Sequence, residues 1–600
     1  MHAPPPYTVV NARVVFISAT SVVIGVAGTV VGVALMRLIG FILHITYFGT
    51  FATGLVQPSI TRLGVWSVLI PVGGAIVIGI MARYGSPAIR GDGIPEVMEG
   101  VLDKQSRISP KVMILKPISA AIAIGTGGPF GAEGPIIATG GALGSLFGQV
   151  LNVTADERKI LLAAGAAAGL TAIFGTPVSA VLLAVELLLF EYRPRSLIPV
   201  ALSSCAAMSV RAVWLGTEPV FHMSNVPPQT MESLAAYVVL GVVIGFAAVL
   251  VTRIVYWIED AYEHLPVHWM WWPAIGAVFV GLIGLLEPRT LSVGYSNIDG
   301  LLSGTIFGRA LLVLVILKFI SWSLYLGSGT SGGTLAPLFT IGGGIGAVLG
   351  SLVAHAMPSL GVNPSVAGLV GMAAIFAGAS QALLASVVMA FEMTRQPMGL
   401  LPLLAGCTAA YFVSLLMLRG SIMTEKLVRR GVSVQTEYQA DYLAQVRVRS
   451  AVTKSVVTLG IHDRVQDVIA WLSSGEPGSE HAGYPVLDDD GLLAGVITRR
   501  DLVGRTVAPD AQVGSLLQRV PAVVFEDNTL REAADHMVRE GVGRLPVVKR
   551  SAPRTLVGIL SRRDLLAAHE ERLDAKDELQ PAVVDLRMAL RFAMHQRPRG

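Results

Sequence analysis

Apolar runs separated by short polar breaks dominate the chain from Val14 to Leu418. The runs that can cross all or most of roughly 30 Å of hydrocarbon as helices are 14–40, 66–82, 111–126, 197–214, 235–254, 270–286, 306–326 and 400–418. Shorter runs broken by Gly and Pro are 135–150, 160–174, 177–190, 335–355 and 383–393. A helix that ends inside the membrane leaves backbone groups that need a polar partner. The pattern predicts a multi-span α-helical membrane protein with interrupted helices.

The pattern changes after residue 430. Residues 1–430 hold 41 charged side chains, whereas the much shorter stretch 431–600 holds 45. A chain that is 53% hydrophobic and uneven in charge is neither disordered nor an ordinary soluble enzyme, so it has a membrane part and a soluble part. The net charge of +4 is too small to indicate a nucleic-acid partner.

The membrane part contains an internal repeat. The stretch GTGGPFGAEGPI (125–136) matches GSGTSGGTLAPL (327–338) at an offset of 202 residues, which aligns Gly131 with Gly333. The register continues through further glycines, and after a four-residue slip Glu186 aligns with Glu392. Two related halves, about 14–190 and 235–420, are therefore expected.

Glycine-rich, interrupted helices at matching places in two halves are typical of a transport site near the midplane of the membrane. A helix that begins inside the membrane directs free amides and its positive end toward that site, which favours an anion. Gly140, Gly144 and Gly148 are interpreted instead as close-packing positions between helices.

Four blocks resemble the signature segments of CLC chloride channels and transporters: GDGIPE (91–96), GPFGAEGP (128–135), GGTLAP (332–337) and SIMTEKL (421–427). The resemblance covers about 14–430 in the right order. It implies an inverted-repeat helical fold, a homodimer with one pore per subunit, and permeation of chloride or other small anions.

Glu133 stands where a helix is expected to begin, and an unpaired carboxylate inside a membrane is costly unless it is functional. Ionised, it competes with chloride for the helix amides, and protonated it loses that advantage. By resemblance Glu133 is the gating glutamate of the family. The alternative is a carboxylate that only caps the helix.

The sequence departs from the family pattern at three positions. Asp92 replaces the usual serine, Leu335 the usual phenylalanine, and Met423 the usual tyrosine. An ionised carboxylate repels an anion, so Asp92 is either protonated, turned away, or part of an altered site. The predicted anion-binding residues are Asp92, Gly93, Ile94, Glu133, Gly134, Thr334, Leu335 and Met423.

Proton coupling is less expected than passive conduction. Residues 163–186 resemble the core segment of the first half in the family, here called the first-half core. Exchangers of the family commonly carry a second glutamate just after this segment. This chain has Leu187 at that position, with Glu186 one residue earlier. Because one residue rotates a helix position by about 100°, Glu186 does not replace it automatically. Its repeat mate Glu392 favours a structural role for Glu186.

The soluble part is a second duplication. The stretches 481–503 and 541–566 each predict two strands and the start of a helix, and helices are expected to begin near Asp463 and Asn528. These copies resemble tandem CBS domains. The resemblance makes an adenine nucleotide a possible ligand of Thr498, Asp501, Ser561 and Asp564. The alternative is that these four residues only cap helices.

The domain plan is an N-terminal tail (1–13), a membrane domain (14–430), a linker (431–447), a cytosolic CBS pair (448–510 and 513–570) and a charged tail (571–600). We expect chloride conduction gated by Glu133 at the plasma membrane, with no enzymatic activity, required cofactor or metal. Open alternatives are a chloride/proton antiporter, a CBS-regulated magnesium transporter and a membrane receptor for nucleotides.

Overall fold

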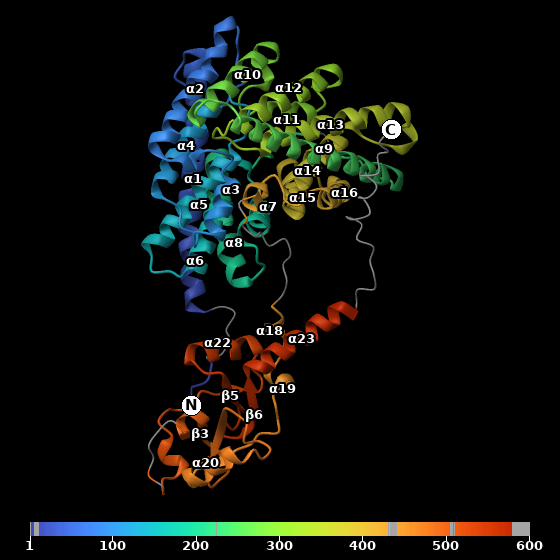
Figure 1. The fold of residues 1–600 in the computed structure, drawn as a ribbon. Coiled ribbons are helices and arrows are strands. Elements are labelled where there is room, and N and C mark those ends of the chain that lie inside the picture. Colours follow the sequence, from blue (N-terminus) through green and yellow to red (C-terminus); the bar gives the residue numbers. More distant parts are fainter. Residues whose placement is uncertain are drawn as a thin grey trace, which may run out of the picture. The chain divides into compact units, whose positions relative to one another are not determined.

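The computed structural model describes residues 2–4, 11–223, 225–429, 431, 441–503, 508 and 510–578, with side chains up to residue 570. Its contacts divide the chain into two units, Val9–Tyr438 and Met1–Thr8 with Gln439–Gly600. In Figure 1 the first unit runs from blue to yellow, and the second is mainly orange and red.

The membrane unit is built from two series of helices in the same order. The first series is α1 (Ala12–Leu43), α2 (Leu69–Ile80), α3 (Ile94–Leu102), α4 (Pro110–Gly125), α5 (Glu133–Val150), α6 (Ala155–Phe174), α7 (Pro177–Ala184) and α8 (Pro194–Leu215). The second is α9 (Met231–Glu263), α10 (Trp272–Leu286), α11 (Tyr295–Leu302), α12 (Gly308–Gly327), α13 (Leu335–Ala356), α14 (Pro364–Ser380), α15 (Leu383–Thr394) and α16 (Leu400–Met417). The predicted repeat is confirmed, and the fold is a multi-span helical one with an inverted internal repeat.

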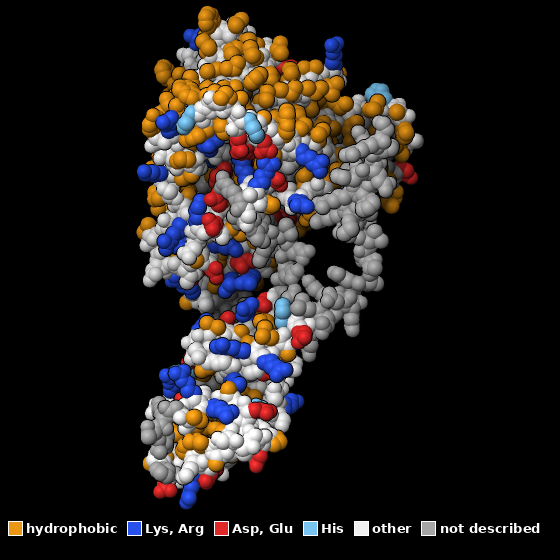
Figure 2. Space-filling view, viewed as in Figure 1, with side chains coloured by type: hydrophobic (Ala, Val, Ile, Leu, Met, Phe, Trp, Pro, Cys, Tyr) orange, Lys and Arg blue, Asp and Glu red, His pale blue; other side chains and the backbone are white. Residues whose placement is uncertain are grey.

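All the predicted apolar runs coincide with helices, and eight helices of the described residues are long and apolar enough to cross a membrane. One prediction is wrong: the run 335–355, expected to be short, forms the 22-residue helix α13, which can span. The helix continues through its glycines, of which Gly342, Gly346 and Gly350 pack against α14 and Gly344 packs against α12. On the face drawn in Figure 2, hydrophobic side chains cover the region of α2, α10 and α12, as contact with lipid requires.

Reciprocal glycine contacts hold the core of each half together. A Cβ on Gly140 would lie 2.2 Å from the carbonyl oxygen of Gly165, and a Cβ on Gly165 would lie 2.1 Å from that of Gly140. In the second half, Gly342 and Gly371 block each other in the same way, at 2.4 and 2.3 Å. The packing role predicted for Gly140 is confirmed, because any larger residue would separate α5 from α6.

The second unit contains two copies of one α/β arrangement. The first copy comprises β1 (Leu459–Gly460), α20 (Val465–Ser474), β2 (Gly483–Leu487), β3 (Leu493–Thr498) and α21 (Arg499–Val503). The second comprises β4 (Val524–Phe525), α22 (Leu530–Glu540), β5 (Arg544–Val548), β6 (Leu556–Ser561) and α23 (Arg562–Glu578). In each sheet the first strand pairs in parallel with the second, which pairs antiparallel with the third. Both predicted helices begin two residues later than expected.

The start of the chain belongs to this α/β unit. The amide of His2 donates to the carbonyl of Pro521 at 3.2 Å, and the amide of Val523 donates to that of His2 at 2.9 Å. The region predicted as an N-terminal tail therefore contributes a short bridge beside the second sheet, before α1 begins at Ala12. The linker predicted at 431–447 contains a short helix, α18 (Tyr442–Gln445). Most of the predicted charged tail lies outside the described residues.

Candidate functional site

The glycine turns of the two halves meet directly. The amide of Gly131 donates to the carbonyl of Gly333 at 3.1 Å, and the amide of Gly333 donates back to Gly131 at 3.0 Å. These residues are repeat mates, and a residue meets its own mate only beside the pseudo-twofold axis that relates the halves. Since α5 and α13 both begin two residues after these glycines, the predicted convergence of helix starts from both halves is confirmed.

Glu133 is the first residue of α5 and is fully buried. Its Oε1 accepts a hydrogen bond of 2.9 Å from the hydroxyl of Tyr295, the first residue of α11 in the other half. The carboxylate also lies against Gly131, where a Cβ would be only 1.6 Å from Oε2. A glycine two residues before the acid is therefore needed for this orientation. Sequence reasoning missed Tyr295. In the structure it follows Gly294, whose φ is positive, just as Ile94 follows Gly93 in the first half.

Asp92 points into the junction rather than away from it. Its Oδ1 accepts a hydrogen bond of 2.7 Å from the amide of Thr334, and its Oδ2 lies 3.4 Å from the amide of Ile94. These amides stand at the starts of α13 and α3, and the side chain is buried. The carboxylate therefore occupies the positive ends of two helices, one from each half.

Close backbone contact joins α3 to α5. Gly93 has a φ of +113°, and a Cβ there would be 2.6 Å from the carbonyl oxygen of Gly134. A Cβ on Gly134 would in turn lie 2.2 Å from the carbonyl oxygen of Asp92. Both glycines are required for Asp92 and Glu133 to approach the same junction.

The remaining predicted anion-binding residues differ in their positions. Thr334 caps α13, and its buried hydroxyl makes no hydrogen bond within the described part of the chain. Leu335 is buried at the first position of that helix. Met423 is also buried, but its amide donates to the hydroxyl of Ser421, and the contacts described for it do not link it to Glu133. Thr334 and Leu335 thus belong to the junction, whereas Met423 is not placed there by any contact.

Two buried lysines are further residues that sequence reasoning missed. Lys116 Nζ donates to the carbonyls of Ile89 and Gly91 at 2.9 and 2.8 Å. Its repeat mate Lys318, at the same offset of 202 residues, holds the corresponding loop in the second half. The acceptors there are the carbonyls of Thr290 and Ser292, at 2.9 and 3.0 Å. Each ammonium group fixes the loop before a short helix, α3 or α11, and places positive charge beside the site.

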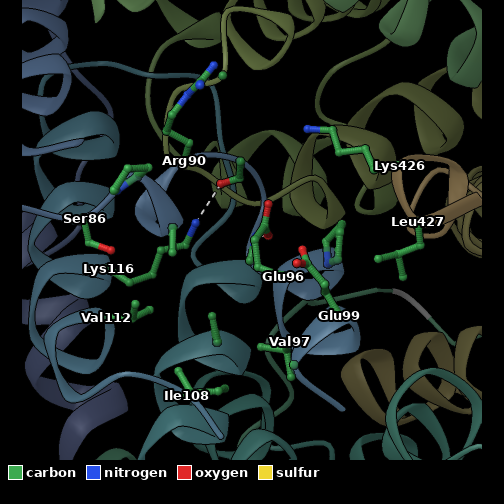
Figure 3. Close-up of a pocket in the computed structure, with 18 of the residues that line it drawn as sticks. Ser86, Arg90, Glu96, Val97, Glu99, Ile108, Val112, Lys116, Lys426 and Leu427 are labelled. Atoms are coloured by element: carbon green, nitrogen blue, oxygen red, sulfur yellow. Dashed lines mark hydrogen bonds between the residues drawn. The ribbon is translucent and has the colours of Figure 1, made fainter. Parts of the chain in front are cut away.

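A cavity of about 920 Å³ reaches the backbone on both sides of Asp92, at Gly91 and Gly93. The side chains that line it include Arg90, Glu96, Glu99, Lys116 and Lys426, which Figure 3 shows around the opening. Glu96 Oε2 accepts a hydrogen bond of 2.7 Å from the amide of Gly93. The cavity thus reaches the backbone beside Asp92, and Asp92 in turn lies against Gly134, which directly follows Glu133.

Comparisons with known proteins agree with this geometry. The family described as "Voltage gated chloride channel" matches residues 73–415, which is more than half of the chain. The chain belongs to this family. CBS domains match residues 448–507 and 513–571 of the same CLC protein.

Curated relatives are distant in sequence. The chain is 26% identical over 565 residues to chloride channel protein CLC-f of Arabidopsis thaliana, with 80% of this chain and 70% of that protein covered. It is 27% identical over 374 residues to the H(+)/Cl(-) exchange transporter ClcA of Yersinia pestis, with 61% and 78% covered. CLC-family chloride transport is the function these relatives share in name.

Solved structures share the fold. A slow cyanobacterial Cl-/H+ antiporter aligns with a TM-score of 0.64 at 21% identity, covering 71% of this chain and 100% of that one. A eukaryotic CLC transporter aligns with a TM-score of 0.59 at 21% identity, covering 91% and 97%. The family match to residues 73–415 is to chloride channels, and it gives no support to the alternative of a magnesium transporter.

Within this CLC fold, Glu186 and Glu392 form a reciprocal pair of helix caps. Glu186 accepts hydrogen bonds of 3.0 Å from the amides of both Leu384 and Ala385, at the start of α15. Glu392 accepts hydrogen bonds of 3.0 and 2.8 Å from Val178 and Ser179, at the start of α7. The predicted structural role of Glu186 is confirmed, since each acid neutralises the positive end of a helix in the opposite half.

The predicted nucleotide ligands of the CBS pair bond to one another. Thr498 Oγ1 donates to Asp501 Oδ2 at 2.6 Å, and Ser561 Oγ donates to Asp564 Oδ2 at 2.8 Å. The amides of Thr498 and Ser561 donate to the same carboxylate oxygens, at 3.1 and 2.6 Å. These contacts are those of helix caps, and nucleotide binding stays a prediction.

Proposed function

We propose that the protein conducts chloride and similar small anions passively through its membrane unit, with Glu133 as the gate. The observation that carries the proposal is the buried Glu133 carboxylate at the start of α5, held by Tyr295 from the opposite half. An ionised carboxylate at a helix start competes with a permeating anion for the same positive end. Protonation removes its charge, so the side chain gives way and the path opens.

Backbone groups provide most of the proposed anion contacts. The residues are Asp92, Gly93, Ile94, Glu133, Gly134, Thr334 and Leu335, with Met423 kept as a prediction. The free hydroxyl of Thr334 is the strongest side-chain candidate because it has no other partner in the described part of the chain. We also propose that the protein is a homodimer with one path per subunit, as the family resemblance implies. Transport is proposed to proceed without a chemical reaction.

Passive conduction is favoured over proton exchange by the residues after the first-half core. Leu187 stands at the position where exchangers carry an acid, and both oxygens of Glu186 accept amide hydrogen bonds from α15. The rival is a chloride/proton exchanger, because ClcA and the cyanobacterial neighbour bear that activity in their names. Purified protein in liposomes with an imposed chloride gradient separates the two. Passive conduction leaves the proton gradient unchanged, and uphill proton movement contradicts it.

Chloride transport itself is tested by efflux of radioactive chloride from liposomes that contain the purified full-length chain. We expect efflux that increases as the medium is acidified, since acid neutralises Glu133. Absence of chloride efflux at every pH would overturn the proposed function. For the CBS pair we propose regulation, and calorimetric titration with ATP against Asp501→Asn tests whether a nucleotide is the signal. The plasma membrane is the proposed location, which fractionation of the source cells tests.

A further inference from the structure

The position of Asp92 has a consequence for the way the path is closed. Its carboxylate accepts the amide of Thr334 at 2.7 Å and lies 3.4 Å from the amide of Ile94. It therefore fills the space between the positive ends of α13 and α3, where an anion in transit would be bound. A carboxylate and a chloride ion cannot both occupy these helix ends at low cost.

Asp92 also stands in series with Glu133. On one side, its chain neighbours Gly91 and Gly93 line the cavity of about 920 Å³. On the other side, a Cβ on Gly134 would be 2.8 Å from Asp92 Oδ1, and Gly134 directly follows Glu133. An ion that leaves the cavity for the junction meets Asp92 before it meets Glu133.

The charges around Asp92 oppose a second anion. Glu96 faces it from α3 and Glu133 lies beyond it at the start of α5, whereas Lys116 from α4 is the neighbouring cation. From α13, the amide of Thr334 donates to it. Lys318 is the neighbouring cation of Glu133. Three carboxylates and two ammonium groups leave the junction negative while all are ionised, so loss of the charge on Asp92 removes the net charge that opposes anion entry.

We infer that Asp92 is a second, inner gate: a tethered anion that competes with the transported anion for the starts of α3 and α13. A proton from the cavity adds to the carboxylate, the neutral acid gives up its hold on the Thr334 amide, and an anion takes its place. This inference rests on the proposed function, because it assumes that anions pass the junction. It differs from a helix cap, which needs an acceptor atom at Asp92 but not a negative charge.

The test is the pH dependence of radioactive chloride efflux from liposomes, for the full-length protein and for Asp92→Asn. Asparagine keeps the acceptor oxygen and removes the charge. With two carboxylate gates in series, the logarithm of flux plotted against pH has a slope of about two in the wild type and about one in Asp92→Asn. We also expect about tenfold faster efflux at neutral pH in Asp92→Asn. Asp103→Asn, an exposed acid at the end of the same helix, is the matched control and keeps the wild-type slope.

A second measurement is chloride titration of the purified protein by calorimetry. At neutral pH, Asp92→Asn binds chloride about tenfold more tightly than the wild type, because the competing charge is gone. Unchanged affinity together with an unchanged slope would overturn the inner gate while leaving the proposed function intact. Efflux absent from both the wild type and Asp103→Asn would overturn the proposed function first.

Loss of folding does not remove the test. Asp92→Ser, which restores the hydroxyl residue usual in the family, is the second variant and gives the same two expectations. If neither variant folds, the wild-type slope decides, since a slope of about one leaves room for only one titrating gate.

Discussion

The two halves of the membrane unit share a framework but differ in chemistry at the junction. Each half provides one lysine, one glycine turn and two helix starts at equivalent positions. The first half adds two carboxylates, Asp92 and Glu133. In the second half, Val293 stands before Gly294 and α11 as Asp92 stands before Gly93 and α3, and Leu335 aligns with Glu133, so both equivalent positions are apolar. The hydroxyl of Tyr295 and the amide of Thr334 act as donors to the two carboxylates.

The residues shared by both halves and the residues found in only one half have different roles. The glycines and lysines hold loops and helices in place in both halves, so they serve the framework. The acids appear in one half only, where the donors of the other half meet them. We therefore expect substitutions at duplicated residues to change stability, and substitutions at residues that differ between the halves to change transport.

The largest expected effect is on stability. Lys116→Met and Lys318→Met each leave two buried carbonyl oxygens without their donor, which costs about 2–4 kcal/mol. Both variants are expected to unfold at clearly lower temperature in detergent, by similar amounts. Lys104→Met is the control, because its pair with Glu99 is half exposed and worth at most about 1 kcal/mol. An unchanged melting temperature for Lys318→Met would contradict the equivalent structural roles of the two lysines.

The next effect is on transport. Glu133→Ala removes the gating charge, so chloride efflux at neutral pH is expected to rise about tenfold and to lose most of its activation by acid. Leu335→Ala, at the repeat mate, is the matched variant and should retain that activation. Equal pH profiles for Glu133→Ala and the wild type would place the gate elsewhere.

A smaller effect is expected from Tyr295→Phe. The Tyr295 hydroxyl stabilises the ionised form of Glu133 through one hydrogen bond worth about 1 kcal/mol. Without that bond the carboxylate takes up a proton more easily, so activation of efflux moves to less acidic pH. Tyr237→Phe, whose hydroxyl accepts a bond from Asn363 instead, should leave the midpoint in place. A midpoint that moves in the acidic direction would contradict the proposed contact.

The smallest expected effect is on the thermal stability of the CBS pair. The two copies carry an ion pair at equivalent positions, but the residues that form it differ. The first copy pairs His462 with Asp489 at 3.2 Å, and the second pairs Asp527 with Arg550 at 2.9 Å. Hydrogen bonds to Gln512 and Asp489 raise the pKa of His462. A raised pKa in the folded state stabilises the fold below the ordinary value of about 6.5, and this contribution is lost as pH rises through the raised value.

His462→Gln should therefore be slightly less stable to heat than the wild type below about pH 6.5, where the charged imidazole stabilises the fold, and equally stable at alkaline pH. Thermal unfolding of the full-length chain, followed by circular dichroism across this range, measures the difference. A variant with the same pH profile as the wild type would show that the exposed pair contributes nothing.

Much of the fold could be predicted because its main signals lie in the sequence. Length and apolarity locate the spans, and glycine register reveals the halves. The helices α3 and α11 were not predicted, since they have only nine and eight residues and begin after Gly93 and Gly294, whose positive φ leaves no pattern of side chains. The pairing of His2 with the second CBS sheet uses backbone groups, which sequence patterns do not encode.

The site could be predicted in part. Glu133 stands out as an acid within an apolar region, and the family blocks indicate Asp92 and Thr334. Tyr295 could not be found in this way, because its hydrogen bond with Glu133 joins residues 162 positions apart. Lys116 and Lys318 carried a detectable signal, their shared offset, which a search for glycines alone overlooks.

The most direct test of an anion site at the meeting point of the two halves is anomalous diffraction from bromide-soaked crystals of the double variant Asp92→Asn with Glu133→Ala. With both competing charges removed, we predict a bromide peak in contact with the Thr334 hydroxyl and the first amides of α13. Ordered bromide found only outside this junction, or no peak at the junction at saturating bromide, would contradict the account.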